Sequence, residues 1–262
     1  MTVDLSGKVA VITGGSRGIG RAVATALAGS GAQTVLAARS EENLKRTAGE
    51  IAASGAPAPE IVAGDLGTHE ACQAVFGAVS QSAGRCDILV NCAGATRAGN
   101  FLDQPDEQWL DGFALKFFGA VRMTRLFWPL LSESGGNVVN IIGGMARTPN
   151  PGNLVGSTVN AAFASFSKGL ATHGIRDGVR VNAIHPGRTE TDRNAELLQQ
   201  QAEAEGKSVE EVAGEAAKKA GIRRLGQPGD IAATALFLVS PEAGHIQGAT
   251  IQVDGGATKG LF

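Results

Sequence analysis

Three glycines near the amino terminus are spaced to hold the phosphates of a nucleotide. Gly14, Gly18 and Gly20 follow the apolar run Val9–Ile12 and lead into a helical stretch that begins at Arg21. Glycine at these positions permits a tight turn and lets the backbone approach a pyrophosphate, and the unpaired N–H groups of a helix N-terminus attract negative charge. Three residues separate the first two glycines, which departs from the usual dinucleotide fingerprint. Alone, this motif is a weak indication of nucleotide binding.

Two arginines are placed to meet a phosphate on the adenosine ribose. Arg17 lies in the glycine-rich turn, and Arg39 ends the second apolar run, where an acidic residue would otherwise bind an unphosphorylated ribose. Their permanent positive charges favour NADP(H) over NAD(H) through charge-assisted hydrogen bonds to the 2′-phosphate. The alternative is that both are ordinary surface arginines.

The elements that must position these residues follow from an alternation of short apolar runs and Ala-rich helical stretches. Short, nearly continuous apolar runs separated by helices are typical of a parallel sheet covered on both faces. We therefore predict an α/β fold, a single Rossmann-type doubly wound domain over residues 1–262. Its seven parallel strands are expected near residues 9–12, 33–36, 60–62, 87–90, 137–142, 179–184 and 249–253.

Residues 192–220 do not follow this alternation of apolar runs and helical stretches, because they are rich in Gln, Glu, Ala and Lys and carry few large apolar side chains. This pattern predicts one or two exposed helices joined to the main body, more a lid than a second core. A mobile cover over a substrate and a plain solvated surface helix are both compatible with it.

Composition excludes several classes of function. A net charge of −2, with 23 Lys+Arg against 25 Asp+Glu, gives no basic excess for binding nucleic acid. The chain has no signal-like start and no apolar run long enough to cross a bilayer, so we expect a soluble cytoplasmic protein without a membrane partner. The three cysteines lack CxxC spacing, which predicts reduced thiols and no metal site.

Further motifs give the chain a family resemblance from Leu5 to Gly256. They occur in the order and spacing of the short-chain dehydrogenase/reductase family, and the chain resembles its 3-oxoacyl-ACP reductase-like members. The matching segments are Thr13–Gly20, Asp65-Leu66, Asn91-Cys92-Ala93-Gly94, Asn182-Ala183-Ile184-His185-Pro186-Gly187 with Thr191, and Val253-Asp254-Gly255-Gly256.

The resemblance implies a set of cofactor contacts. Asp65 would accept a hydrogen bond from the adenine amino group, Asn91 would line the adenosine side, and Thr191 would approach the nicotinamide carboxamide. Alternatively, Asp65 only caps a helix and Asn91 only braces the sheet. The full set of expected contacts is Gly14, Ser16, Arg17, Gly18, Ile19, Gly20, Arg39, Asp65, Leu66, Asn91, Ala93, Gly94, Asn160, Pro186, Gly187, Thr189 and Thr191.

The catalytic positions depart from the family. Where the family carries Asn, Ser, Tyr and Lys, this chain carries Lys116, Gly143, Gly156 and Asn160, and it contains no tyrosine anywhere. A missing general acid typically costs about 10² to 10⁴ in rate, and a missing oxyanion donor about 10² to 10³. We therefore expect the family's tetrad chemistry to be absent and the two glycines to widen the pocket.

Two side chains are candidates for replacement chemistry. Lys116 extends from a helix that lines the site, and a partly desolvated lysine can have a lowered pKa; the alternative is that it pairs with a surface or inter-subunit carboxylate. His185 has a near-neutral intrinsic pKa, although a histidine there more often packs behind the cofactor. Ser157 and Thr158 offer hydroxyls near the empty tyrosine position, without an identifiable base.

Two functions remain open at this point. The first is an NADP(H)-dependent oxidoreductase with a nonstandard site that reduces a C=O, C=C or C=N bond of a small molecule. The second is a catalytically inactive pseudoenzyme that senses a nucleotide or ligand or serves as a partner subunit. The resemblance also implies a homo-oligomer, a tetramer or a dimer, formed through the two long helices that flank the site and the C-terminal strand.

Overall fold

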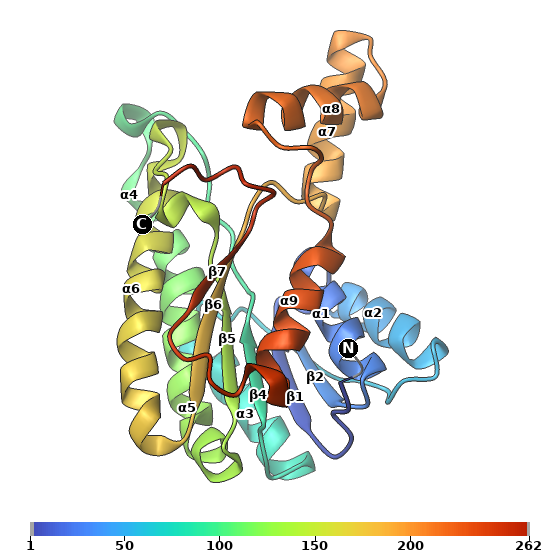
Figure 1. The fold of residues 1–262 in the computed structure, drawn as a ribbon, viewed down its shortest axis with the longest axis vertical. Helices are drawn as coiled ribbons and strands as arrows, with labels where there is room; N and C mark the ends of the chain where they lie inside the picture. The colour runs from blue at the N-terminus through green and yellow to red at the C-terminus, as the bar shows by residue number, and fades with distance from the viewer. Residues whose placement is uncertain (1–2, 261–262) are drawn as a thin grey trace.

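A seven-stranded parallel sheet forms the centre of the molecule (Figure 1). The computed structural model describes residues 3–260, except for the side chains of residues 193 and 197. The strand order is β3-β2-β1-β4-β5-β6-β7, which confirms the doubly wound prediction. The strands are β1 (Val9–Thr13), β2 (Gln33–Ala38), β3 (Glu60–Ala63), β4 (Ile88–Asn91), β5 (Asn137–Ile141), β6 (Arg180–Pro186) and β7 (Thr250–Val253).

Helices cover both faces of this sheet. The helices are α1 (Gly18–Gly29), α2 (Glu41–Ala53), α3 (His69–Ser82), α4 (Asp106–Gly112), α5 (Gly119–Ser134), α6 (Leu154–Asp177), α7 (Asp192–Glu205), α8 (Val209–Ala220) and α9 (Pro228–Val239). Helices α1, α2 and α9 pack on one face, and α3, α5 and α6 pack on the other.

Alternate side chains of each strand point to opposite faces and build the two cores. In β1, Ala10 and Ile12 enter the core under α1 and α9, whereas Val9 and Val11 enter the core under α3 and α5. All four are at most 5% exposed. A strand buried on both faces needs apolar residues throughout, which is why the apolar runs predict the strands.

The strand order reverses between β1 and β4, which are hydrogen-bonded neighbours in the middle of the sheet. The connection after β1 leads to β2 on one side of the sheet, and the connection after β4 leads to β5 on the other side. The two connections therefore point away from each other. The divergence leaves a crevice at the carboxyl ends of the strands, where open α/β sheets bind their ligands.

Helices α7 and α8 form an arm that extends beyond the sheet, at the top of Figure 1. They pack on each other around a small apolar cluster of their own, which contains Leu198, Ala202, Val212, Ala217 and Leu225. Serine and glutamate at the start of α8 form a capping box, which satisfies two N–H groups of its first turn. The arm spans the residues predicted as a lid-like segment.

A π-helix, Phe113–Phe118, separates α4 from α5. Its hydrogen bonds run from residue i to i+5, so it holds one residue more than an α-helical turn, and such segments often occur at functional sites. Lys116 lies within it. Within residues 3–260, no helix is long and apolar enough to cross a membrane.

Candidate functional site

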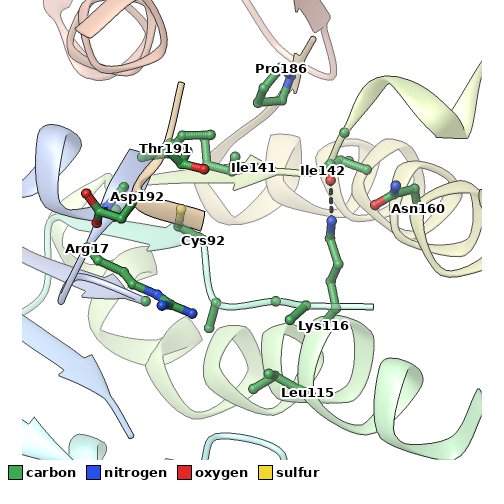
Figure 2. A pocket seen from close by; sticks show the side chains of 18 of the residues that line it. Arg17, Cys92, Leu115, Lys116, Ile141, Ile142, Asn160, Pro186, Thr191 and Asp192 are labelled. Carbon is green, nitrogen blue, oxygen red and sulfur yellow. Dashed lines mark hydrogen bonds between the residues drawn. The ribbon is translucent and has the colours of Figure 1, made fainter. Parts of the chain in front are cut away.

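One cavity of about 1030 Å³ opens at the carboxyl ends of the strands. It runs from the glycine-rich turn after β1, past the ends of β4 and β5, to the start of α6. Figure 2 shows Arg17, Thr191 and Asp192 towards one end of it and Lys116 and Asn160 towards the other. We call these two ends the nucleotide half and the reaction half.

The glycine-rich turn forms the wall of the nucleotide half. A Cβ atom at position 20 would overlap the carbonyl oxygen of Gly14, so only glycine allows α1 to start this close to β1. The side chain of Arg17, in the extended residue just before α1, lines the cavity. The N-terminus of α1 therefore faces the cavity, and the N–H groups of Ile19 and Gly20 in its first turn have no acceptor among the described residues, as anion binding requires.

Arg17 and Arg39 both line the nucleotide half and are both exposed. Neither guanidinium forms an ion pair with another of the described residues. Two unpaired guanidinium groups beside one cavity suit a phosphate, which accepts bidentate hydrogen bonds from arginine.

Most of the expected cofactor contacts line this one cavity. They are Gly14, Ser16, Arg17, Gly18, Ile19, Gly20, Arg39, Leu66, Ala93, Gly94, Asn160, Pro186, Gly187 and Thr191. The side chains of Asp65, Asn91 and Thr189 do not line it.

Asn91 lies in the middle of the sheet and is 2% exposed. Its Nδ2 atom donates to Thr124 Oγ1 at 3.0 Å and to Asn140 Oδ1 at 2.9 Å, and Asn140 in turn donates to Ser167 at 2.8 Å. This buried chain of side chains ties β4 to α5, β5 and α6. The Nδ2 atom of Asn91 thus braces the sheet, whereas its Oδ1 atom has no hydrogen-bond partner among the described residues.

Asp65 and Thr189 lie beside the cavity rather than in its wall. Asp65 is exposed between the lining residues Gly64 and Leu66, and its Oδ1 atom accepts a hydrogen bond from the Gly67 N–H at 3.0 Å. Thr189 is 8% exposed, and its hydroxyl donates to a backbone carbonyl two residues earlier at 3.1 Å. The helix after β3 is capped by Thr68 and not by Asp65.

Lys116 reaches from the π-helix into the reaction half, where its Nζ atom donates to the carbonyl oxygen of Ile142 (Figure 2). The backbone of Gly94 makes room for its stem, because a Cβ atom at position 94 would lie 2.7 Å from Lys116 Cγ. The residue is partly exposed through the cavity, but its amine is removed from bulk water. This burial lowers the pKa of Lys116 from 10.5 to about 8, with a small opposing effect of Cys92.

No carboxylate among the described residues pairs with Lys116. Its ammonium has three N–H donors, of which one is used by the Ile142 carbonyl. The amine is therefore available to a molecule in the cavity, and the residues that the structure describes do not form the alternative ion pair with it.

Asn160 extends from α6 to the end of β5, close to Gly143. Gly143 has φ of +130°, a conformation that side chains disfavour, and a Cβ atom there would lie 3.0 Å from Asn160 Nδ2. Asn160 is 1% exposed, and its Oδ1 atom has no hydrogen-bond partner. A buried, unpartnered acceptor in a cavity wall is suited to a hydroxyl group of a ligand.

The space beside Gly156 is already filled. A Cβ atom at this position would lie 2.7 Å from Asn153 Oδ1 and 2.8 Å from Thr96 Oγ1, and Gly156 does not line the cavity. Asn153 is held there because its Oδ1 atom caps α6 by accepting from the Gly156 N–H at 2.9 Å. The expectation that this glycine widens the pocket is therefore wrong.

The hydroxyls of the following Ser157 and Thr158 bond to backbone groups of the same helix turn and the preceding loop.

His185 lies in β6, behind the cavity wall rather than in it. It is 2% exposed, and neither ring nitrogen has a hydrogen-bond partner among the described residues. Burial, together with the nearby positive charges of Arg147 and Lys116, lowers the pKa of His185 from 6.5 to about 4. The ring is neutral at neutral pH, so it has no readily transferable proton there.

Further lining residues are not among the expected contacts. Most of them lie in the loops that follow the strand ends, whereas Asn43 lies in α2 and Leu115 in the π-helix beside Lys116. They are Ala38, Ser40, Asn43, Gly64, Cys92, Ala95, Leu115, Ile141, Ile142, Gly144, Met145, Thr148, Asn150, Arg188, Asp192, Ala257 and Thr258. In the part of the chain that the structure describes, no group of three or more His, Cys, Asp or Glu side chains is arranged to hold a metal ion.

Known proteins resemble this chain over almost its whole length. A family model described as enoyl-(acyl carrier protein) reductase matches residues 14–258. The short-chain reductase protein NovJ of Streptomyces niveus is 35% identical over 249 residues, which are 95% of this chain and 93% of the relative. The 3-oxoacyl-[acyl-carrier-protein] reductase FabG of Vibrio cholerae is 32% identical and covers 97% and 98% of the two chains. Among solved structures, L-sorbose reductase from Gluconobacter frateurii, complexed with NADPH and L-sorbose, superposes with a TM-score of 0.95 at 34% identity over all of both chains.

Proposed function

This chain belongs to the short-chain dehydrogenase/reductase family, and on that premise we propose that it is an NADP(H)-dependent oxidoreductase that works without the family's tyrosine. The enzyme would prefer NADP(H), take a proton from Lys116 and reduce a small-molecule substrate that carries a C=O, C=C or C=N bond.

The nucleotide half supports NADP(H). Arg17 and Arg39 are free to bind the 2′-phosphate, and the N-terminus of α1 suits the pyrophosphate. In the reaction half, the buried Asn160 Oδ1 atom has no partner and suits a ribose hydroxyl. The L-sorbose reductase that this chain resembles was crystallised with NADPH. We infer that the same cofactor fits here and that the two arginines favour it over NADH.

Lys116 is the observation that carries the proposed reaction. When bound, the nicotinamide supplies a hydride, and negative charge then develops on the atom at the other end of the reduced bond. That atom needs a proton donor within hydrogen-bond reach. In the reaction half, Lys116 is the cavity-lining side chain with a transferable proton near neutral pH, because its pKa is about 8.

The missing groups limit which substrates suit such a site. Gly143 offers no hydroxyl to polarise a carbonyl, and the space at Gly156 is filled by neighbouring side chains. A general acid contributes about 10² to 10⁴ in rate and an oxyanion donor about 10² to 10³. Activated carbonyls, enones and imines are therefore better substrates for this proposal than unactivated ketones.

The test is single-turnover oxidation of NADPH across ketones, enones and imines, with Lys116→Met as the variant. We expect the rate constant to fall by about 10² or more in the variant, and the wild-type rate of reduction to decline above pH 8 as the ammonium loses its proton. The matched control is Lys218→Met, on the exposed surface of the arm helix α8. Equal rates and equal pH profiles for wild type and Lys116→Met would show that Lys116 takes no part in the reaction.

The alternative function is a nucleotide-binding protein without turnover, a pseudoenzyme that acts as a sensor or partner subunit. The observation in its favour is the glycine at both positions where the family carries Ser and Tyr. The same experiment separates the two. Measurable NADPH affinity with no oxidation by any class of substrate supports the sensor.

We further propose that the protein is a homo-oligomer, a dimer or a tetramer, formed through α5, α6 and β7. On α5, Phe118 is 46% exposed, and a groove of about 340 Å³ between α5 and α6 is lined by Trp128, Phe166 and Leu170 among others. In contrast, Phe127 and Phe163 on the same helices lie in the core of the monomer. Light scattering that gives the mass of a single chain, 26.6 kDa, would eliminate this part of the proposal.

A cytoplasmic location completes the proposal. It is supported by the three cysteines, which are all free; Cys72 and Cys86 are buried and Cys92 is partly exposed. Reduced thiols are typical of the cytoplasm.

A further inference from the structure

Asp192 is the first residue of the α7–α8 arm, and its carboxylate binds the first turn of α1. Its Oδ2 atom accepts a hydrogen bond from the Gly18 N–H at 3.1 Å, and its Oδ1 atom accepts from the guanidinium of Arg21 at 3.2 Å. These partners lie 174 and 171 residues away in the sequence. A single carboxylate thus joins the base of the arm to the glycine-rich turn, and we call this contact the clasp.

The arm to which the clasp belongs does not pack in either of the two main cores. Helices α7 and α8 pack on each other around their own apolar cluster, apart from the two cores on the sheet. Besides the clasp, an isolated parallel bridge between Thr189 and Gly226 joins the two chain segments at the base of the arm. The position of the arm relative to the cavity therefore depends on a few polar contacts at its base.

Thr191, the residue before Asp192, lies beside the same turn. Its hydroxyl caps α7 by accepting from the Asn194 N–H at 3.4 Å, and its methyl carbon would lie 3.3 Å from a Cβ atom at Gly18. Both Thr191 and Asp192 line the cavity (Figure 2), as does Gly18. When the clasp is closed, Thr191 lies against the turn that is expected to hold the pyrophosphate.

The clasp leaves room for a phosphate at the same helix terminus. It uses the N–H group of Gly18, whereas the N–H groups of Ile19 and Gly20 have no acceptor among the described residues. The ion pair with Arg21 offsets the negative charge of Asp192, which reduces its repulsion of a bound anion. The carboxylate and a pyrophosphate can therefore share the first turn of α1.

We propose that Asp192 is a positioning residue, whose clasp on Gly18 and Arg21 holds Thr191 and the α7–α8 arm over the pyrophosphate of a bound dinucleotide. This inference rests on the proposed NADP(H) binding. A closed clasp favours nucleotide binding, and by thermodynamic reciprocity the bound nucleotide holds the arm in place.

The experiment compares Asp192→Ala and Asp192→Asn with the wild type in two measurements. The first is the affinity for NADPH and for adenosine 2′-monophosphate, which contains the arginine-binding phosphate but no pyrophosphate. The second is the rate of tryptic cleavage after Lys207, an exposed residue between α7 and α8, with and without NADPH. The matched control is Glu203→Gln, which removes one negative charge from an exposed position of the arm.

We expect Asp192→Ala to weaken NADPH binding by about 5- to 20-fold, within the usual range of coupling between sites, and to change the affinity for adenosine 2′-monophosphate less than twofold. Asp192→Asn keeps an acceptor for the Gly18 N–H but loses the ion pair, so its effect is smaller. Cleavage after Lys207 becomes faster in Asp192→Ala, and NADPH protects this site less than it does in the wild type. Combining Asp192→Ala with Arg21→Gln weakens binding by less than the product of the single effects.

Three results would overturn the proposal. In the first, Asp192→Ala binds NADPH as tightly as the wild type or more tightly. In the second, it weakens both ligands equally, which indicates a general structural effect. In the third, wild type binds neither NADPH nor adenosine 2′-monophosphate, and the proposed function then fails together with the inference. The first two results leave the proposed function intact.

Discussion

Protonation of His185 is expected to destabilise the fold as the pH falls below neutrality. The pKa of this residue is about 4 in the folded protein, and its ordinary value of 6.5 applies to the unfolded chain. Between these two values the unfolded chain binds a proton that the folded protein does not bind. The free energy of unfolding therefore decreases as the pH falls through this window, and below about pH 4 the loss is complete.

The size of this loss follows from the pKa shift. Each unit is equivalent to about 1.36 kcal/mol, so the full loss is roughly 3 kcal/mol, of which about 2.5 kcal/mol has occurred by pH 4.5. The residue is 2% exposed, so little screening by solvent is expected. A loss of this size is a large fraction of the stability of a typical domain.

Urea unfolding at pH 7 and pH 4.5 measures the effect. The variant His185→Gln lacks the titrating ring, and His245→Gln is the matched control at an exposed position. We expect the wild type and the control to lose about 2 to 2.5 kcal/mol more than His185→Gln between these two pH values. If His185→Gln loses as much stability as the wild type, the ring is not buried in its neutral form, and the argument against His185 as a proton donor fails with it.

Two further predictions concern residues that line or border the cavity. Gly156→Tyr should not restore the family's proton donor, because Asn153 and Thr96 occupy the space of the new side chain; we expect a loss of about 1 to 3 kcal/mol in the free energy of unfolding and no gain in the rate of NADPH oxidation. A tenfold faster oxidation would contradict this. Replacing both Arg17 and Arg39 with alanine should weaken NADPH binding by about tenfold or more and leave NADH binding nearly unchanged, which parallel titrations of the two nucleotides can measure. Equal losses for both nucleotides would refute the assignment of the arginines to the 2′-phosphate.

The fold follows from the apolar runs in the sequence. Each of the seven expected strands is present, and their ends differ from the expected ones by at most two residues; the run at residues 9–12, for example, becomes β1, Val9–Thr13. The prediction succeeds because a strand buried on both faces requires apolar residues without interruption. The lid-like segment is recognisable for the opposite reason, since its helices bury few side chains against the sheet.

The cavity could be located from the sequence, but the state of its side chains could not. Glycines and strand ends indicate where a nucleotide would lie, since these positions depend on the backbone. The free acceptor of Asn160, the filled space beside Gly156 and the buried ring of His185 depend on side-chain packing between distant segments. The clasp of Asp192 also joins residues more than 170 positions apart, and no local pattern reveals it.

A change in the length of the π-helix Phe113–Phe118 would alter the reaction half without the substitution of any residue. One residue corresponds to about 100° of rotation in an α-helix, so the loss of a single residue here would turn α4 by that amount relative to α5. Helix α5 is anchored in the core through Met123, Phe127 and Leu131 and would keep its packing. A length change in this segment would therefore present a different side chain to the cavity in place of Lys116. Insertion and deletion can alter the chemistry of this helix independently of the core that supports it.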